Sequence, residues 1–210
     1  MDKILLLLSV TILTACKAEI KNNKTKFIQK VDMEKDEIIT LGGGCYWCTE
    51  AIFQRLNGVD SLVTGFMGGI TVNPTYEEVC TGKTGHAEVS QITFNPEVIS
   101  LKEILEVFFT THDPTTLDRQ GEDIGNQYRS VVFYKDEKQK ATAEQVIQEI
   151  EKEQIYDSPI VTTLEPAGPF YQSPDYHKNY YNQHGEKPYC SFVIAPKVKK
   201  FKEKYQDKLK

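Results

Sequence analysis

The segment Gly-Gly-Gly-Cys-Tyr-Trp-Cys at residues 42–48 combines two thiols with two aromatic side chains. An apolar run before it predicts a strand over residues 37–41, and the pattern after it predicts a helix over 48–57 that stops at Gly58. Cys45 is therefore expected on a strand-to-helix turn, where unpaired backbone N–H groups and the helix dipole lower the pKa of a thiol. A thiolate at this turn would be a nucleophile, and the aromatic pair beside it would wall a small apolar pocket.

The start of the chain has the features of a secretory signal. Lys3 precedes a short apolar stretch over residues 4–13, which is too short to span a bilayer comfortably. Leu-Thr-Ala-Cys at residues 13–16 resembles a bacterial lipobox, in which the cysteine is lipidated and becomes the mature N-terminus. We predict a signal peptide over residues 1–15, lipidation of Cys16, and a lipid-anchored location in the bacterial cell envelope, on its periplasmic or outer face. The alternative is an ordinary signal peptide with a chance cysteine.

The rest of the chain divides into a tether, a domain and a basic end. Residues 16–36 are polar and charged and predict a lipidated tether. Residues 37–196 are about 160 residues, enough for a single catalytic domain with its own core. Residues 197–210 alternate lysines with aromatic residues and predict an exposed basic helix or tail. The net charge of −5 argues against a nucleic-acid partner.

Four cysteines lie within the domain: Cys45, Cys48, Cys80 and Cys190. Two structural disulfides are one interpretation, because an extracytoplasmic location permits them, but a domain of this size does not need them. A zinc site would need a second closely spaced pair of ligands, and neither the isolated cysteines nor the four histidines form one, so no metal is expected. Cys45 and Cys48 instead have the spacing of a redox pair. Cys80 is expected to be a buried apolar cysteine.

The patterns along the domain alternate between strands and helices, but not in a strict parallel series. Ser100 is expected to cap the helix that follows it. The remaining predicted elements are an apolar run at 61–65, a helical turn within 73–82, strands at 88–94, 128–134 and 159–165, a loop at 113–125 and a helix at 137–154. This order favours an α/β or α+β fold with a sheet on one side and helices on the other.

At Gly-Cys-Tyr-Trp the chain resembles the peptide methionine-S-sulfoxide reductases of the A type. Six further blocks match that family in the same order across residues 38–196, so chance similarity is negligible. They are Gly-Phe-Met-Gly-Gly at 65–69, Asn-Pro-Thr-Tyr-Glu-Glu-Val-Cys at 73–80, Thr-Gly-His-Ala-Glu at 84–88, the blocks 112–114 and 119–130, and the C-terminal pair of 169–171 and 189–190.

The resemblance implies a two-layer, ferredoxin-like α/β roll that reduces the S epimer of methionine sulfoxide, free or in proteins. Cys45 would be the nucleophile and would be oxidised to a sulfenic acid. Glu88 would protonate the sulfoxide oxygen if burial raises its pKa. The substrate-binding residues would be the aromatic cup for the methyl group, two tyrosines that hydrogen-bond the oxygen, and one supporting carboxylate. Tyr46 and Trp47 would form the cup, Tyr76 and Tyr128 would bond the oxygen, and Asp123 would be the carboxylate.

Two departures from the family leave the recycling step open. Many members have glycine in place of Cys48, and here Cys190 is not followed by the usual glycine-rich tail. The three-residue spacing suits a Cys45–Cys48 disulfide, whereas the match to the family favours Cys190 as the resolving cysteine. Both cysteines could also act in sequence and relay the disulfide outward. Either disulfide would be reduced by a thioredoxin-like dithiol, so no metal, flavin or nucleotide cofactor is implied.

Two other functions compete with sulfoxide reduction. A thiol–disulfide oxidoreductase would use Cys45 and Cys48 on protein disulfides and would not need Glu88. A non-catalytic lipoprotein would bind partners through the tyrosine-rich residues 171–181 and would keep its function without Cys45. The matching carboxylate and tyrosines argue against both. The expected partners are therefore oxidised proteins, free methionine sulfoxide, a thioredoxin-like reductant and a membrane, and the chain is expected to be a monomer.

Overall fold

The computed structural model describes residues 36–210. The predicted signal peptide, the lipidation site Cys16 and nearly all of the predicted tether lie outside the described residues. Among the described residues, no helix is both long and apolar enough to cross a bilayer.

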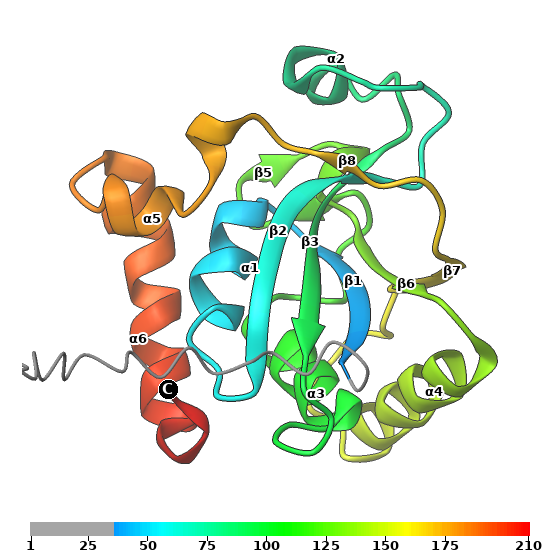
Figure 1. The fold of residues 1–210 in the computed structure, drawn as a ribbon. Helices are drawn as coiled ribbons and strands as arrows, with labels where there is room; N and C mark the ends of the chain where they lie inside the picture. Colours follow the sequence, from blue (N-terminus) through cyan, green and yellow to red (C-terminus); the bar gives the residue numbers. More distant parts are fainter. Residues whose placement is uncertain (1–35) are drawn as a thin grey trace, which may run out of the picture. The chain divides into compact units, whose positions relative to one another are not determined.

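A six-stranded mixed sheet forms the centre of the domain, in the order β7-β6-β1-β3-β2-β8 (Figure 1). All neighbours in it are antiparallel except β6 and β7. Four of its strands, with α1 and α3, follow the order βαββαβ that defines a ferredoxin-like unit. The strands are β1 (Glu37–Gly43), β2 (Val59–Met67), β3 (Ala87–Phe94), β6 (Ser130–Tyr134), β7 (Thr163–Pro166) and β8 (Tyr171–Gln172). The expected ferredoxin-like α/β fold is confirmed.

Six α-helices and a few shorter turns complete the domain. The helices are α1 (Tyr46–Phe53), α2 (Tyr76–Cys80), α3 (Leu101–Thr111), α4 (Glu137–Lys152), α5 (Tyr180–Gln183) and α6 (Ala195–Lys204). A π-helix, Cys190–Ile194, runs directly into α6. Two-residue strands β4 (Arg119–Gln120) and β5 (Asp123–Ile124) pair with each other, and 3₁₀ turns occupy Asn126–Tyr128, Asp175–His177 and Gln206–Lys208.

The main core lies between the sheet and helices α1, α3 and α4. Ile39 and Leu41 of β1 pack there with Phe53, Phe108 and other fully buried side chains. The alternation of apolar residues along β1 turns these side chains to the helix-covered face. A smaller cluster of apolar side chains from β2, β3 and β6 is packed against Phe170.

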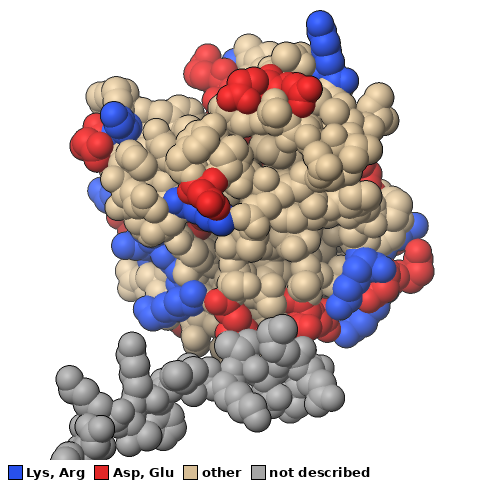
Figure 2. All heavy atoms as spheres, turned by 45° about the horizontal axis from the view of Figure 1, so that its top comes forward, with Lys and Arg blue, Asp and Glu red and all other residues tan. Residues whose placement is uncertain are grey.

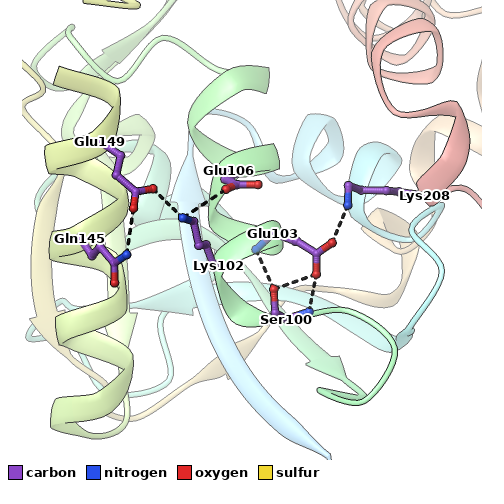
Figure 3. A network of polar contacts seen from close by, with 7 residues as sticks. All are labelled: Ser100, Lys102, Glu103, Glu106, Gln145, Glu149 and Lys208. Atoms are coloured by element: carbon purple, nitrogen blue, oxygen red, sulfur yellow. Dashed lines mark hydrogen bonds and ion pairs between the residues drawn. The ribbon is translucent and has the colours of Figure 1, made fainter. Parts of the chain in front are cut away.

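Polar contacts fasten α3 to its neighbours (Figure 3). Ser100 and Glu103 form a reciprocal capping box at the start of α3, as the sequence predicts for Ser100. Glu103 also pairs with Lys208 near the C-terminus, and these contacts lower the pKa of Glu103 to about 2. Lys102 reaches Glu149 of α4 at 2.7 Å. Helices α3 and α4 are thus linked by an ion pair on their exposed side.

Several element boundaries differ from the sequence predictions. Helix α1 ends at Phe53, because Leu56 instead pairs with Leu209 of the C-terminal segment. The first part of the strand predicted at 159–165 is irregular, and the predicted loop at 113–125 contains β4 and β5. Helix α6 carries exposed lysines, but Val198 and Phe201 are buried, so it is not exposed on all sides as expected.

Candidate active site

Cys45 lies at the N-terminal end of α1, where β1 ends, as the sequence predicts. It is the N-cap residue, and its carbonyl accepts a hydrogen bond from the Cys48 backbone N–H at 3.0 Å. Gly44 before it has φ +90°, and a Cβ atom there would lie 2.5 Å from the Gln120 side chain, so only glycine fits. Figure 2 turns this end of the domain toward the viewer and shows a surface whose centre has few charged side chains.

Glu88 lies on β3 beside this turn and is only 2% exposed. Its Oε2 accepts a hydrogen bond from the Tyr46 backbone N–H at 3.1 Å, and its carboxyl also interacts directly with Cys45. Burial raises the pKa of Glu88 to about 8. The carboxyl is therefore mostly protonated at neutral pH, which is the condition under which Glu88 could act as a proton donor.

The two thiols of the pair have opposite pKa shifts. Burial raises the pKa of Cys45 well above its usual value, and hydrogen bonding to Cys48 and the charge of Glu88 add to this. The expected lowering by the helix end is therefore wrong, because burial outweighs the few N–H groups of an eight-residue helix. The pKa of Cys48 is lowered to about 7, mainly by the hydrogen bond with Cys45; the charge of Lys197 also lowers it, whereas burial raises it.

Tyr76 and Tyr128 reach the same site from different elements. Tyr76 opens α2 and Tyr128 ends a 3₁₀ turn, and both rings pack against the cluster that contains Cys45. Burial raises the pKa of both phenols, and the charge of Glu88 contributes to each shift. Both hydroxyls therefore stay protonated and can donate hydrogen bonds beside Glu88.

An aromatic wall surrounds the two cysteines. Trp47 stacks on Tyr180 with ring centroids 3.8 Å apart, and His177 meets it edge-on at 5.1 Å. The hydroxyl of Tyr46 is hydrogen-bonded to Nδ1 of His177, and its ring packs 5.9 Å from Phe66. The hydroxyl of Tyr46 thus has His177 as its hydrogen-bond partner, so Tyr46 contributes mainly its apolar ring to the wall.

Glu50 of α1 holds the outer part of this wall in place. It is buried, and its two carboxylate oxygens accept the backbone N–H groups of Asn179 at 2.8 Å and Tyr180 at 3.3 Å. Asn179 has φ 51°, a conformation in which asparagine is among the tolerated residues. These bonds fix the start of α5 and with it the ring that stacks on Trp47.

Asp123 joins the site through a tyrosine that the sequence analysis quoted only as the neighbour of Cys190. The hydroxyl of Tyr189 donates to Oδ2 of Asp123 at 2.6 Å and lies 3.9 Å from Sγ of Cys48. Cys190 itself is fully buried in the same cluster, at the start of the π-helix, and its thiol contributes no exposed surface.

The structure therefore gathers nearly all predicted site residues in one place. Cys16 is the exception, since it lies outside the described residues. Four further residues of the site were not predicted: His177, Tyr180, Glu50 and Lys197. The crowding of tyrosines over 171–181 was the signal for the first two. All four cysteines within residues 36–210 are free thiols, and Cys80 is exposed rather than buried as expected. Over the same residues, no group of three or more His, Cys, Asp or Glu is placed to hold a metal ion.

Known proteins resemble this chain over almost the whole domain. The family model for peptide methionine sulfoxide reductase matches residues 37–209. The peptide methionine sulfoxide reductase MsrA of Saccharolobus solfataricus is 54% identical over 174 residues, covering 83% of this chain and 97% of that protein. The protein of the same description from Polynucleobacter asymbioticus is 50% identical over 170 residues, covering 81% of this chain and 90% of its own length.

Solved structures give the same family. Mxr1 from Saccharomyces cerevisiae in its reduced form superposes with a TM-score of 0.71 at 34% identity, covering 76% of this chain and 91% of that one. A structure of Mxr1 in complex with Trx2 superposes with a TM-score of 0.51 at 29% identity, covering 74% of this chain and 91% of that one.

Proposed function

The chain belongs to the peptide methionine sulfoxide reductase family, and we propose that it reduces the S epimer of methionine sulfoxide, free or in proteins. The observation that carries the proposal is the contact of Cys45 with a buried carboxyl group, Glu88, whose pKa is about 8. Sulfoxide reduction needs a soft nucleophile for the sulfur and a proton donor for the oxygen, and these two side chains supply them. The family works without a metal or organic cofactor.

In the first step, the sulfur of Cys45 attacks the sulfoxide sulfur. Glu88 protonates the oxygen, and the oxygen is transferred to Cys45 as both the S–S bond formed by this attack and the S–O bond of methionine sulfoxide break. The thiol is thereby oxidised by two electrons to a sulfenic acid, methionine is released, and the thiol proton replaces the one that Glu88 gave. Tyr76 and Tyr128 donate hydrogen bonds to the oxygen, while Tyr46 and Trp47 enclose the methyl group.

In the second step, we assign Cys48 as the resolving cysteine. Its sulfur interacts directly with Cys45, and its pKa is the lower of the two thiols. Attack on the sulfenic acid forms a Cys45–Cys48 disulfide and releases water. A thioredoxin-like dithiol then reduces this disulfide, and the similarity to Mxr1, which has been solved in complex with Trx2, supports such a donor.

A single turnover without reductant tests both steps. We expect the reduced full-length protein, mixed with racemic methionine sulfoxide, to consume only the S epimer and to form one methionine per chain. Peptide mapping by mass spectrometry should then find the Cys45–Cys48 disulfide, also in the Cys190→Ser variant. A Cys45–Cys190 disulfide would contradict the assignment of Cys48. No methionine, with all thiols free, would contradict sulfoxide reduction and favour a thiol–disulfide oxidoreductase.

We further propose that the protein is a monomer anchored in the bacterial cell envelope by a lipid on Cys16. The support is the Leu-Thr-Ala-Cys segment after a short apolar stretch, which has the pattern of a lipoprotein signal. A single acyl chain binds membranes only marginally, whereas several chains on one cysteine anchor stably.

Labelling with an alkyne-bearing fatty acid tests the anchor. Cells that express the wild-type protein should label it and retain it in the membrane fraction. The Cys16→Ser variant should lose both the label and the membrane association, whereas Cys80→Ser, the control, should keep both. An unlabelled wild-type protein in the soluble envelope fraction would show that residues 1–15 are an ordinary signal peptide.

A further inference from the structure

Cys48 is surrounded by polar groups from several elements. Its Sγ lies 3.9 Å from Nζ of Lys197 on α6 and 3.9 Å from the hydroxyl of Tyr189. Cys45 precedes it by one helical turn, and the charges of Asp123 and Glu88 face it from β5 and β3. A thiol that is 4% exposed thus has one ammonium group and two carboxyl groups around it.

Lys197 carries the positive charge in this set, and a positive charge beside a thiol stabilises its thiolate. Tyr189 has a single hydroxyl proton, which it donates to Asp123 at 2.6 Å, so this proton is not available to Cys48. The ammonium of Lys197 has three protons. Within residues 36–210 no carboxylate lies within ion-pair distance of it, and Cys48 is its hydrogen-bond acceptor.

We propose that Lys197 is a positioning residue for disulfide formation: its ammonium holds Cys48 as a thiolate directed at the oxidised Cys45. The proposal deepens the proposed function and rests on it. The thiolate attacks the sulfenic sulfur of Cys45, the S–S bond forms as the S–O bond breaks, and the departing hydroxide takes a proton to become water. No further oxidant or reductant is needed for this step.

Lys197 can contact Cys48 although its own side chain is only partly buried. Its side chain is half-buried and lines a cavity of about 490 Å³ between α3 and α6, together with Asp113, Lys200 and Lys204. The side chain therefore stays in contact with solvent while its ammonium reaches the buried sulfur of Cys48.

Alkylation measures the effect on Cys48 directly and needs no substrate. We expect the Lys197→Met variant to raise the pKa of Cys48, read from the pH dependence of peptide-mapped alkylation, by about one unit or more. Lys197→Arg should restore most of the shift. Lys200→Met is the matched control, because Lys200 lines the same cavity without contacting Cys48, and it should leave the pKa unchanged.

The rate of disulfide closure provides the second readout. In single turnovers, Lys197→Met should form methionine at the wild-type rate and then close the disulfide about threefold more slowly at pH 6. The difference should vanish or reverse above about pH 9, because a more basic thiolate is a better nucleophile once it is ionised. A purely structural defect would slow closure equally at every pH.

The two proposals fail in different ways. An unchanged alkylation profile of Cys48 in Lys197→Met, with methionine still formed, would overturn the role of Lys197 alone. Absence of methionine formation in the wild-type protein would overturn the reductase function. If Lys197→Met loses thermal stability relative to Lys200→Met, Lys197→Gln, which keeps a polar end on the side chain, is measured in its place and must give the same shift.

Discussion

Substitution of Cys45 by serine abolishes methionine formation, with a loss on the order of 10⁴-fold or more in the rate of the first step. A hydroxyl group is a poor nucleophile toward sulfur and cannot accept the oxygen as a sulfenic acid does. The result is informative because a more acidic thiol remains three residues away. At neutral pH, Cys48, with a pKa of about 7, is ionised to a greater extent than Cys45.

The position of the thiol therefore decides which cysteine reacts with the substrate. Cys45 is hydrogen-bonded to the carboxyl of Glu88, the proton donor, whereas Cys48 has Lys197 and Tyr189 as its close polar neighbours. We expect Cys48→Ser to form about one methionine per chain and to stop at a sulfenic acid, which dimedone traps. Chromatography that separates the sulfoxide epimers measures how much of the S epimer each variant converts to methionine. Methionine formation by Cys45→Ser would show that ionisation, not position, selects the nucleophile.

The turn that presents Cys45 could be predicted because its signals are local. The apolar run of β1, the glycines and the helix pattern all lie within about 20 residues, and Gly44 is needed for the turn itself. The same holds for the capping box at Ser100 and for the strand that carries Glu88. The ferredoxin-like fold was expected from the family resemblance, and no local pattern indicates the strand order β6-β1-β3-β2.

The electrostatics of the site could not be predicted from local patterns. The pKa of Cys45 depends on burial, Cys48 and Glu88. That of Cys48 depends on Cys45 and also on Lys197, which is 149 residues away in the chain. The outer wall also depends on distant segments, since Glu50 binds the backbone of Tyr180, whose ring stacks on Trp47. Contacts between distant segments leave no periodic trace in the sequence.

Substitution of Glu88 by glutamine lowers the rate of the first step by about 10²- to 10³-fold at pH 7. Glutamine keeps the size of the side chain and can donate a hydrogen bond to the sulfoxide oxygen, but it cannot transfer a proton. Since burial raises the pKa of Glu88 to about 8, the wild-type rate should fall as the pH rises through 8 and the acid is lost. The variant should lack this decline, apart from any ionisation of Cys45. Single-turnover rates between pH 6 and 9.5 measure both profiles, with the exposed Glu77→Gln on α2 as control.

Stability separates this catalytic role from a structural one. The unfolded chain releases the Glu88 proton above pH 4.5, whereas the folded protein retains it up to about pH 8, so this group makes the fold progressively less stable between these values. Glutamine carries no charge to bury, and Glu88→Gln should therefore be at least as stable as the wild type at pH 8, by urea denaturation. A variant that is slow and also unstable at pH 8 would mean that Glu88 acts by holding the Tyr46 backbone. Loss of rate with equal or greater stability would mean that the fold tolerates a buried acid because the reaction requires its proton.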